Sequence, residues 1–91
     1  MESELMVSGS IVDSWLERTS SRRGEARLVL QVSVPGRPRE LIVVEAPTTL
    51  VPDAGWLEDL RGNHCHGSPV AASGRLTERG SVSASRLHLE R

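Results

Sequence analysis

An alternation of apolar and polar residues with a period of two constrains this sequence more than any other feature. In its clearest example every second residue is apolar over residues 28–34: Leu28, Leu30, Val32 and Val34. This is the pattern of a β-strand with one buried face. Residues 5–11 alternate in the same way, and residues 39–46 form a β-branched run after a turn signal at residues 35–38. We therefore predict a first strand, followed by a hairpin of the second and third strands.

Between residues 52 and 62 the pattern changes to that of a helix. Asp53 is a candidate N-cap and Gly62 a candidate stop, so we expect one short helix there. The alternation returns over residues 70–76 and again over residues 86–89. These last segments predict a fourth and a fifth strand.

Five strands with one helix between the third and the fourth is the element order of the OB-fold, a small β-barrel. We therefore expect residues 1–91 to form a single all-β domain, a five-stranded OB-fold barrel with one short helix. A chain of this size can build one core without metal or disulfide bonds. Strongly curved strands need a glycine or a bulge where they bend, so Gly9 and Gly74 are expected at such bends.

The segment WLEDLRGNHCHGSPVAASGRL, residues 56–76, combines a predicted helix, a Gly-Ser strand entry and a strand that ends in Gly-Arg-Leu. Together with the first strand, LMVSGSIVD, it resembles the bacterial single-stranded DNA-binding protein family. The resemblance implies an OB-fold protein that binds single-stranded DNA or RNA, takes part in DNA replication and assembles into a homodimer or homotetramer.

The sequence departs from that family in two respects. Family members usually stack bases on aromatic residues, whereas Pro38, Arg39 and Gly80 stand near the corresponding places here. The family also has a long acidic tail that recruits other proteins, whereas this sequence ends at Arg91, directly after the last predicted strand. We therefore expect a divergent member of the family that does not recruit partners through a tail.

The arginines are the main candidates for a binding function. The net charge of −1 conceals a segregation, because residues 18–39 contain six arginines and one glutamate. All eleven basic residues are arginine. Arginine suits phosphate binding and base stacking, but the joint absence of Lys, Phe and Tyr is also what a GC-rich coding sequence would produce.

In an OB-fold, nucleic acid binds to the face of the second and third strands and to the loops that join strands one to two and four to five. Seven arginines are expected on that face: Arg18, Arg22 and Arg23 in the first loop, Arg27 on the outward side of the second strand, Arg37 and Arg39 in the following turn, and Arg79 in the loop between the fourth and fifth strands. Trp15, at the expected end of the first strand, is a candidate for base stacking. A tryptophan at either place is more often part of the core, so a core position is the expectation for Trp15 as well as for Trp56, with base stacking as the functional alternative for Trp15.

These residues predict a protein that binds single-stranded nucleic acid, with DNA as the first candidate, mainly through electrostatic contacts. The alternative is an OB-fold module for protein interaction or assembly that does not bind nucleic acid. The acidic residues between Glu40 and Asp59 and the missing aromatic residues favour that alternative.

His64, Cys65 and His66 form the most conspicuous polar cluster. Structural zinc sites usually draw on spaced pairs of ligands, so we expect a solvent-exposed loop here and no metal. Adjacent residues of an extended segment point to opposite sides, so neither histidine is expected to activate the thiol. We expect no enzymatic activity and no cofactor.

The remaining features of the sequence bear on the cellular compartment of the protein. A single cysteine cannot form an internal disulfide bond, and the first residues lack the basic and apolar segments of a secretory signal. No apolar run approaches the roughly 20 residues of a membrane-spanning helix. The sequence therefore predicts a cytoplasmic protein without a membrane partner.

Overall fold

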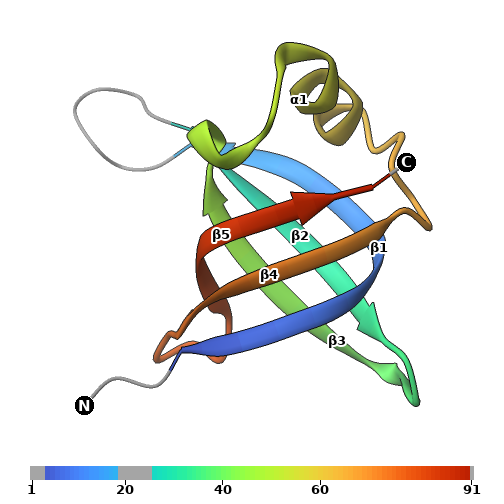
Figure 1. The fold of residues 1–91 in the computed structure, drawn as a ribbon, viewed down its shortest axis with the longest axis vertical. Coiled ribbons are helices and arrows are strands. Elements are labelled where there is room, and N and C mark those ends of the chain that lie inside the picture. Colours follow the sequence, from blue (N-terminus) through green and yellow to red (C-terminus); the bar gives the residue numbers. More distant parts are fainter. Residues whose placement is uncertain (1–3, 19–25, 91) are drawn as a thin grey trace.

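The computed structural model describes residues 4–18 and 26–90, and residues 37–39 through their backbone only. Five strands form a closed barrel in the order β1-β2-β3-β5-β4 (Figure 1). The elements along the chain are β1 (Leu5–Arg18), β2 (Ala26–Val34), β3 (Arg37–Pro47), the 3-10 turn η1 (Thr48–Leu50), α1 (Ala54–Arg61), β4 (Pro69–Leu76) and β5 (Val82–Leu89). Neighbouring strands are antiparallel except β3 and β5, which are parallel. The predicted five-stranded OB-fold, with its helix between β3 and β4, is confirmed.

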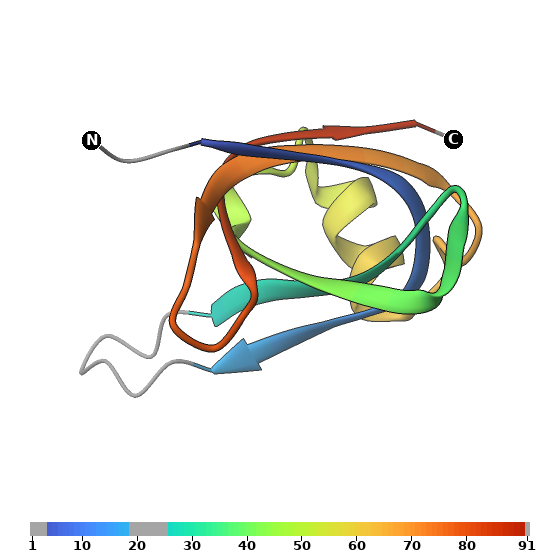
Figure 2. The same cartoon turned by 90° about the horizontal axis from the view of Figure 1, so that it is seen from below.

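The barrel closes because β1 pairs with two different strands. Residues Leu5–Ser10 pair with β4, whereas Ser10–Arg18 pair with β2, and the register shifts after Ile11. A Cβ atom on Gly9 would overlap the carbonyl oxygen of Ser33 in β2, so only glycine permits this close approach. Gly9 therefore lies at a bend, as predicted. Figure 2 shows β1 curving around the barrel.

The core fills the barrel with the inward-facing residues of all five strands. Its fully buried side chains include Ile11, Leu28, Leu30, Val32, Val44, Val82 and, from α1, Leu60. Helix α1 lies at the upper end of the barrel in Figure 1. The buried hydroxyl of Ser14 donates a hydrogen bond of 2.7 Å to the carbonyl oxygen of Leu60, which joins the end of the helix to β1.

Helix α1 begins and ends close to the predicted positions. The Asp53 carboxylate accepts a hydrogen bond of 2.8 Å from the backbone N–H of Trp56, which confirms the N-cap. Gly62 is the C-cap, but the residue with the left-handed backbone is Asn63, with φ of 59°. With eight residues, α1 is too short to cross a bilayer, and it is the only α-helix in the part of the chain described here.

The segment that contains His64, Cys65 and His66 is a turn, but the expectation of a solvent-exposed loop is wrong for Cys65. Its side chain is 3% exposed and belongs to the core, whereas both histidines are exposed. The turn is held against the barrel because the N–H of Gly67 donates to the carbonyl oxygen of Ile11 at 2.7 Å. Packing against β1 therefore buries a thiol that the local sequence places between two polar residues.

Gly74 occupies the second tight position of the barrel, at a register shift between β4 and β5. A Cβ atom there would overlap the Ser83 carbonyl oxygen and lie 2.7 Å from the Cα of Ala84. We expect Gly74→Val to lower the free energy of unfolding by about 1–3 kcal/mol, because the backbone of β5 would have to move. Urea unfolding measures the change, with Ala71→Val on the same strand as the control. Equal stability of both variants would contradict a close approach at Gly74.

Candidate nucleic-acid interface

The predicted binding surface is the outer face of β2 and β3, which continues onto β1, and the strand register sets its layout. Residues paired across antiparallel strands share a face. Three rows cross this face from β1 to β3: Asp13, Gln31 and Val43; Trp15, Val29 and Glu45; and Glu17, Arg27 and Pro47. The face therefore combines one aromatic residue, several apolar residues and a group of charges at one end.

Trp15 lies on this outer face. Its neighbours Ser14 and Leu16 face inward, since Ser14 is buried and Leu16 packs against the core. Trp15 is half-buried and stands opposite Val29, which is only 3% exposed. The expected core position is therefore wrong for Trp15, because its place in the strand alternation turns it outward. Trp56, by contrast, packs against the core as expected.

Glu45 is the centre of an ion-pair network at the charged end of the face. Its carboxylate oxygens accept hydrogen bonds of 2.9 and 2.7 Å from Nη2 of Arg79, and one of them accepts a third, of 3.1 Å, from the Ser81 hydroxyl. Nη2 of Arg27 lies 3.4 Å from the same carboxylate and 3.1 Å from Oε2 of Glu17. Two arginines and two glutamates thus form a group of four charges that sum to zero.

The structure brings two of the predicted arginines together. Arg27 faces outward from β2, and Arg79 reaches the same carboxylate from the loop between β4 and β5, both as predicted. Arg37 stands opposite Val34, at the other end of the β2–β3 pairing. Arg22 and Arg23 lie outside the described residues.

Three arginines occupy elements other than those predicted. Arg18 is the last residue of β1 and not part of a loop, because the pairing with β2 continues to the Arg18–Ala26 pair. Arg37 and Arg39 belong to β3 and not to the preceding turn, which consists of Pro35 and Gly36 alone. Strand pairing extends both strands beyond the segments in which apolar alternation is visible.

Glu17 and Glu45 belong to this site, although neither was predicted from the sequence. Glu45 follows an apolar β-branched run and has a side chain only 11% exposed. Because a carboxylate is rarely buried without a partner, a glutamate in such a strand is a signal for a paired charge. Its partner Arg79 lies 34 residues away, so only the fold shows which arginine pairs with it.

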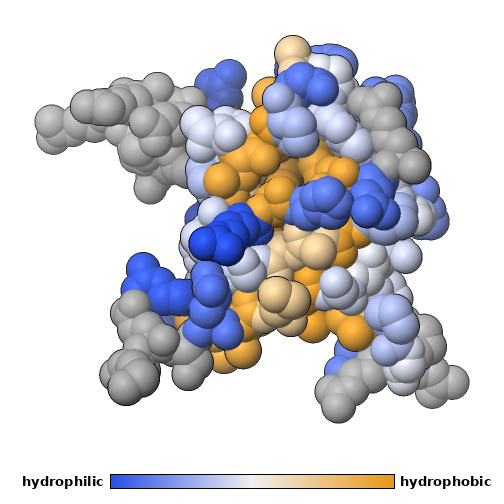
Figure 3. All heavy atoms as spheres, in the orientation of Figure 1, coloured by the Kyte–Doolittle hydropathy of each residue, from blue (hydrophilic) through white to orange (hydrophobic). Residues whose placement is uncertain are grey.

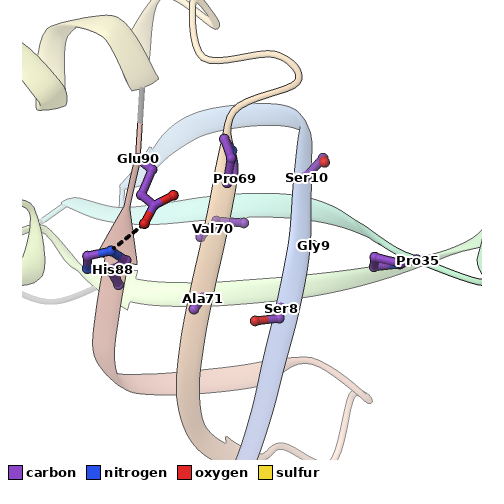
Figure 4. A pocket seen from close by; sticks show the side chains of 9 residues that line it. All are labelled: Ser8, Gly9, Ser10, Pro35, Pro69, Val70, Ala71, His88 and Glu90. Carbon is purple, nitrogen blue, oxygen red and sulfur yellow. Dashed lines mark hydrogen bonds and ion pairs between the residues drawn. The ribbon is translucent and has the colours of Figure 1, made fainter.

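The opposite outer face, formed by β1, β4 and β5, also carries exposed apolar residues. Figure 3 shows apolar residues across the middle of this face. Met6 is 81% exposed there and borders a hollow of about 200 Å³ next to Ala71 and Leu87. A second hollow, of about 340 Å³, lies beside Gly9 and Val70 (Figure 4). His88 and Glu90 form an exposed pair of 3.1 Å at its edge.

Comparison with known proteins supports the fold. No protein-family model and no curated protein matches the sequence. The structure is similar to the mitochondrial single-stranded DNA-binding protein Rim1 of S. cerevisiae, with a TM-score of 0.67 and 13% sequence identity over 100% of this chain and 97% of that chain. It is also similar to the N-terminal domain of PriB from Thermoanaerobacter tencongensis, described as dimeric, with a TM-score of 0.59 and 17% identity over 97% and 96% of the two chains.

The different positions of the two tryptophans predict different effects on stability. Trp56→Ala removes a side chain that packs on the core and should lower the free energy of unfolding by about 3 kcal/mol. Trp15→Ala removes a cross-strand contact on the outer face and should cost no more than about 1 kcal/mol. Urea unfolding of both variants measures the difference. A larger loss for Trp15→Ala would contradict its place on the outer face.

Proposed function

We propose that this protein binds single-stranded nucleic acid, with single-stranded DNA as the first candidate, along the outer face of β1, β2 and β3. The observation that carries the proposal is the arrangement of this face, where Trp15 lies next to the charged row of Arg27 and where β3 begins with two arginine positions. Rim1, which has a similar fold, is named as a mitochondrial single-stranded DNA-binding protein, and this supports the proposal.

The length of the face suits a single strand. Arg27 and Val34 mark the two ends of the β2–β3 pairing, and seven residues at about 3.3 Å per residue separate them by about 23 Å. OB-folds cover about 4–16 nucleotides. One strand can therefore contact Arg27 and Arg79 near one end and Arg37 and Arg39 near the other. Arg18, Arg22 and Arg23 complete the proposed set of phosphate contacts.

Electrostatic contacts should contribute more to this binding than base stacking. Stacking on an aromatic side chain is worth about 1–3 kcal/mol per base. The sequence has no Phe or Tyr, and Trp15 is the tryptophan that lies on this face. Each phosphate that an arginine neutralises adds about −0.7 to the slope of log affinity against log salt concentration. Affinity should therefore fall steeply with salt. Such binding requires no cofactor, metal or catalytic group, and we propose none.

Replacing Arg37 and Arg39 together by alanine tests the phosphate contacts. The salt slope for a single-stranded oligonucleotide should become flatter by about 1–1.5, because two proposed phosphate contacts are removed. Fluorescence anisotropy at several salt concentrations measures the slope. The control removes two exposed arginines elsewhere, Arg61→Ala with Arg86→Ala, and should alter the slope less.

Two outcomes would contradict this assignment. A Trp15→Ala variant that loses more affinity than the double arginine variant, with an unchanged salt slope, would show that stacking dominates. Wild-type protein that binds neither DNA nor RNA strands at about 20 mM salt, where screening is weak, would contradict nucleic-acid binding altogether.

A module for protein interaction or assembly is the second candidate. Two observations favour it: carboxylates already pair with Arg27 and Arg79, and the face of β1, β4 and β5 carries an exposed apolar surface.

The first half of β1 has a free edge. Its residues pair with β4 on one side, and on the other side the described residues form no ladder before Ser10. A free strand edge and an apolar face both support association of copies of the chain. We therefore propose that the protein forms a homodimer or homotetramer.

Met6→Glu tests this association. Met6 is 81% exposed, so the variant should fold normally but place a charge in the proposed contact surface and shift the protein toward a 9.9 kDa monomer. Light scattering at high micromolar concentration measures the mass. Leu41→Glu, on the outer side of β3, is the matched control and should leave the assembly intact. A monomeric wild-type protein would contradict the proposal.

A further inference from the structure

The Glu45 carboxylate contacts Arg27 and Arg79, the two arginines that would bind a phosphate of the nucleic acid in the proposed function. Three donors surround it: Nη2 of Arg79, which contacts both carboxylate oxygens, the Ser81 hydroxyl and, at 3.4 Å, Nη2 of Arg27. Guanidinium groups and hydroxyls bind phosphate oxygens in the same way. Glu45 therefore resembles a phosphate that is built into the protein.

The charges of this group cancel. Arg27 lies between Glu17 and Glu45, and Arg79 contacts Glu45. A phosphate that approaches two free arginines would meet two positive charges, whereas here it meets a group with no net charge. Neither arginine can release a full counterion on binding, so neither contributes its full share to affinity or to salt dependence.

The two arginines differ in how easily they can leave Glu45. The Arg79 side chain is 63% exposed, whereas the Arg27 side chain is 33% exposed and also contacts Glu17 through Nε and Nη2. Because only the Arg79 end of this pair is exposed, its guanidinium can turn toward solvent, while the Glu45 carboxylate keeps Arg27 and the Ser81 hydroxyl as partners. The loop that carries Arg79 is itself closed by hydrogen bonds between Thr77 and Ser81. Arg79 can therefore exchange partners by rotation of its side chain while the loop backbone stays in place.

We propose that Glu45 is an internal competitor that occupies Arg27 and Arg79 in the free protein, and that a phosphate of the bound strand gains Arg79 by displacing it from Glu45. This inference rests on the proposed function. It assigns to Glu45 the control of affinity at one end of the face. It also explains how an arginine-rich face can retain selectivity, since only a strand that contacts the rest of the face displaces the internal carboxylate.

Glu45→Gln tests the exchange, since glutamine keeps the shape and an acceptor for Ser81 but removes the charge. Affinity for a single-stranded oligonucleotide at about 0.1 M salt should rise about fivefold or more, and the salt slope should steepen by about 0.7. Glu17→Gln makes the same change of charge on the same face but leaves the Arg79 contact, so its gain should be smaller. Fluorescence anisotropy measures all three proteins.

A double-mutant cycle identifies the arginine that is released. Arg79→Ala should remove the gain in the Glu45→Gln background, so that the double variant binds no more tightly than the wild-type protein. Equal gains in the two glutamine variants would overturn the exchange, and so would a loss of affinity in Glu45→Gln, which would mean that Glu45 positions Arg79 for binding.

A measurement on the wild-type protein covers the case in which Glu45→Gln does not fold. The side-chain NMR signals of Arg79 should shift when an oligonucleotide is added, and unchanged signals in a bound complex would overturn the inference. If the wild-type protein binds and Glu45→Gln shows no gain, the exchange alone fails. If neither protein binds a single strand at about 20 mM salt, the proposed function fails and the inference fails with it.

Discussion

Closure of the barrel by β1 is the constraint on which the rest of the structure depends. A five-stranded sheet leaves two free edges unless one strand can pair at both ends of the sheet, and β1 does so by changing from β4 to β2 near Gly9. Gly74 permits a similarly close approach between β4 and β5. Two glycines therefore allow backbones to come closer than any side chain would permit, and the enclosed core follows from that closure.

Closure also brings distant charges together. The parallel contact between β3 and β5 comprises only two residue pairs, Val44–Val82 and Glu45–Ser83. The carboxylate of Glu45 extends this short contact by bonding to Ser81 and Arg79, which precede β5. The same interactions that join the two strands thus determine how much positive charge the outer face presents to a ligand. Glu45 therefore takes part both in the contact between β3 and β5 and in the charge of the outer face.

Much of the fold could be predicted from local patterns. Alternation identified the centres of the strands, Asp53 and Gly62 marked the ends of the helix, and Gly9 and Gly74 marked the bends. The ends of β1 and β3 could not be predicted, because residues there become strand by pairing with a neighbour and not by apolar alternation. The burial of Cys65 was missed for a related reason, since it depends on a turn that docks on β1.

The sequence by itself determined the fold class, because a period of two, a single helical segment and two glycines inside strands are compatible with few architectures of this length. It also determined that arginines are concentrated between residues 18 and 39. Only the tertiary structure showed that Arg27 and Arg79 share the carboxylate of Glu45. Ion pairing depends on distances of a few ångströms, and Glu45 and Arg79, 34 residues apart in the chain, reach that distance only when the barrel closes.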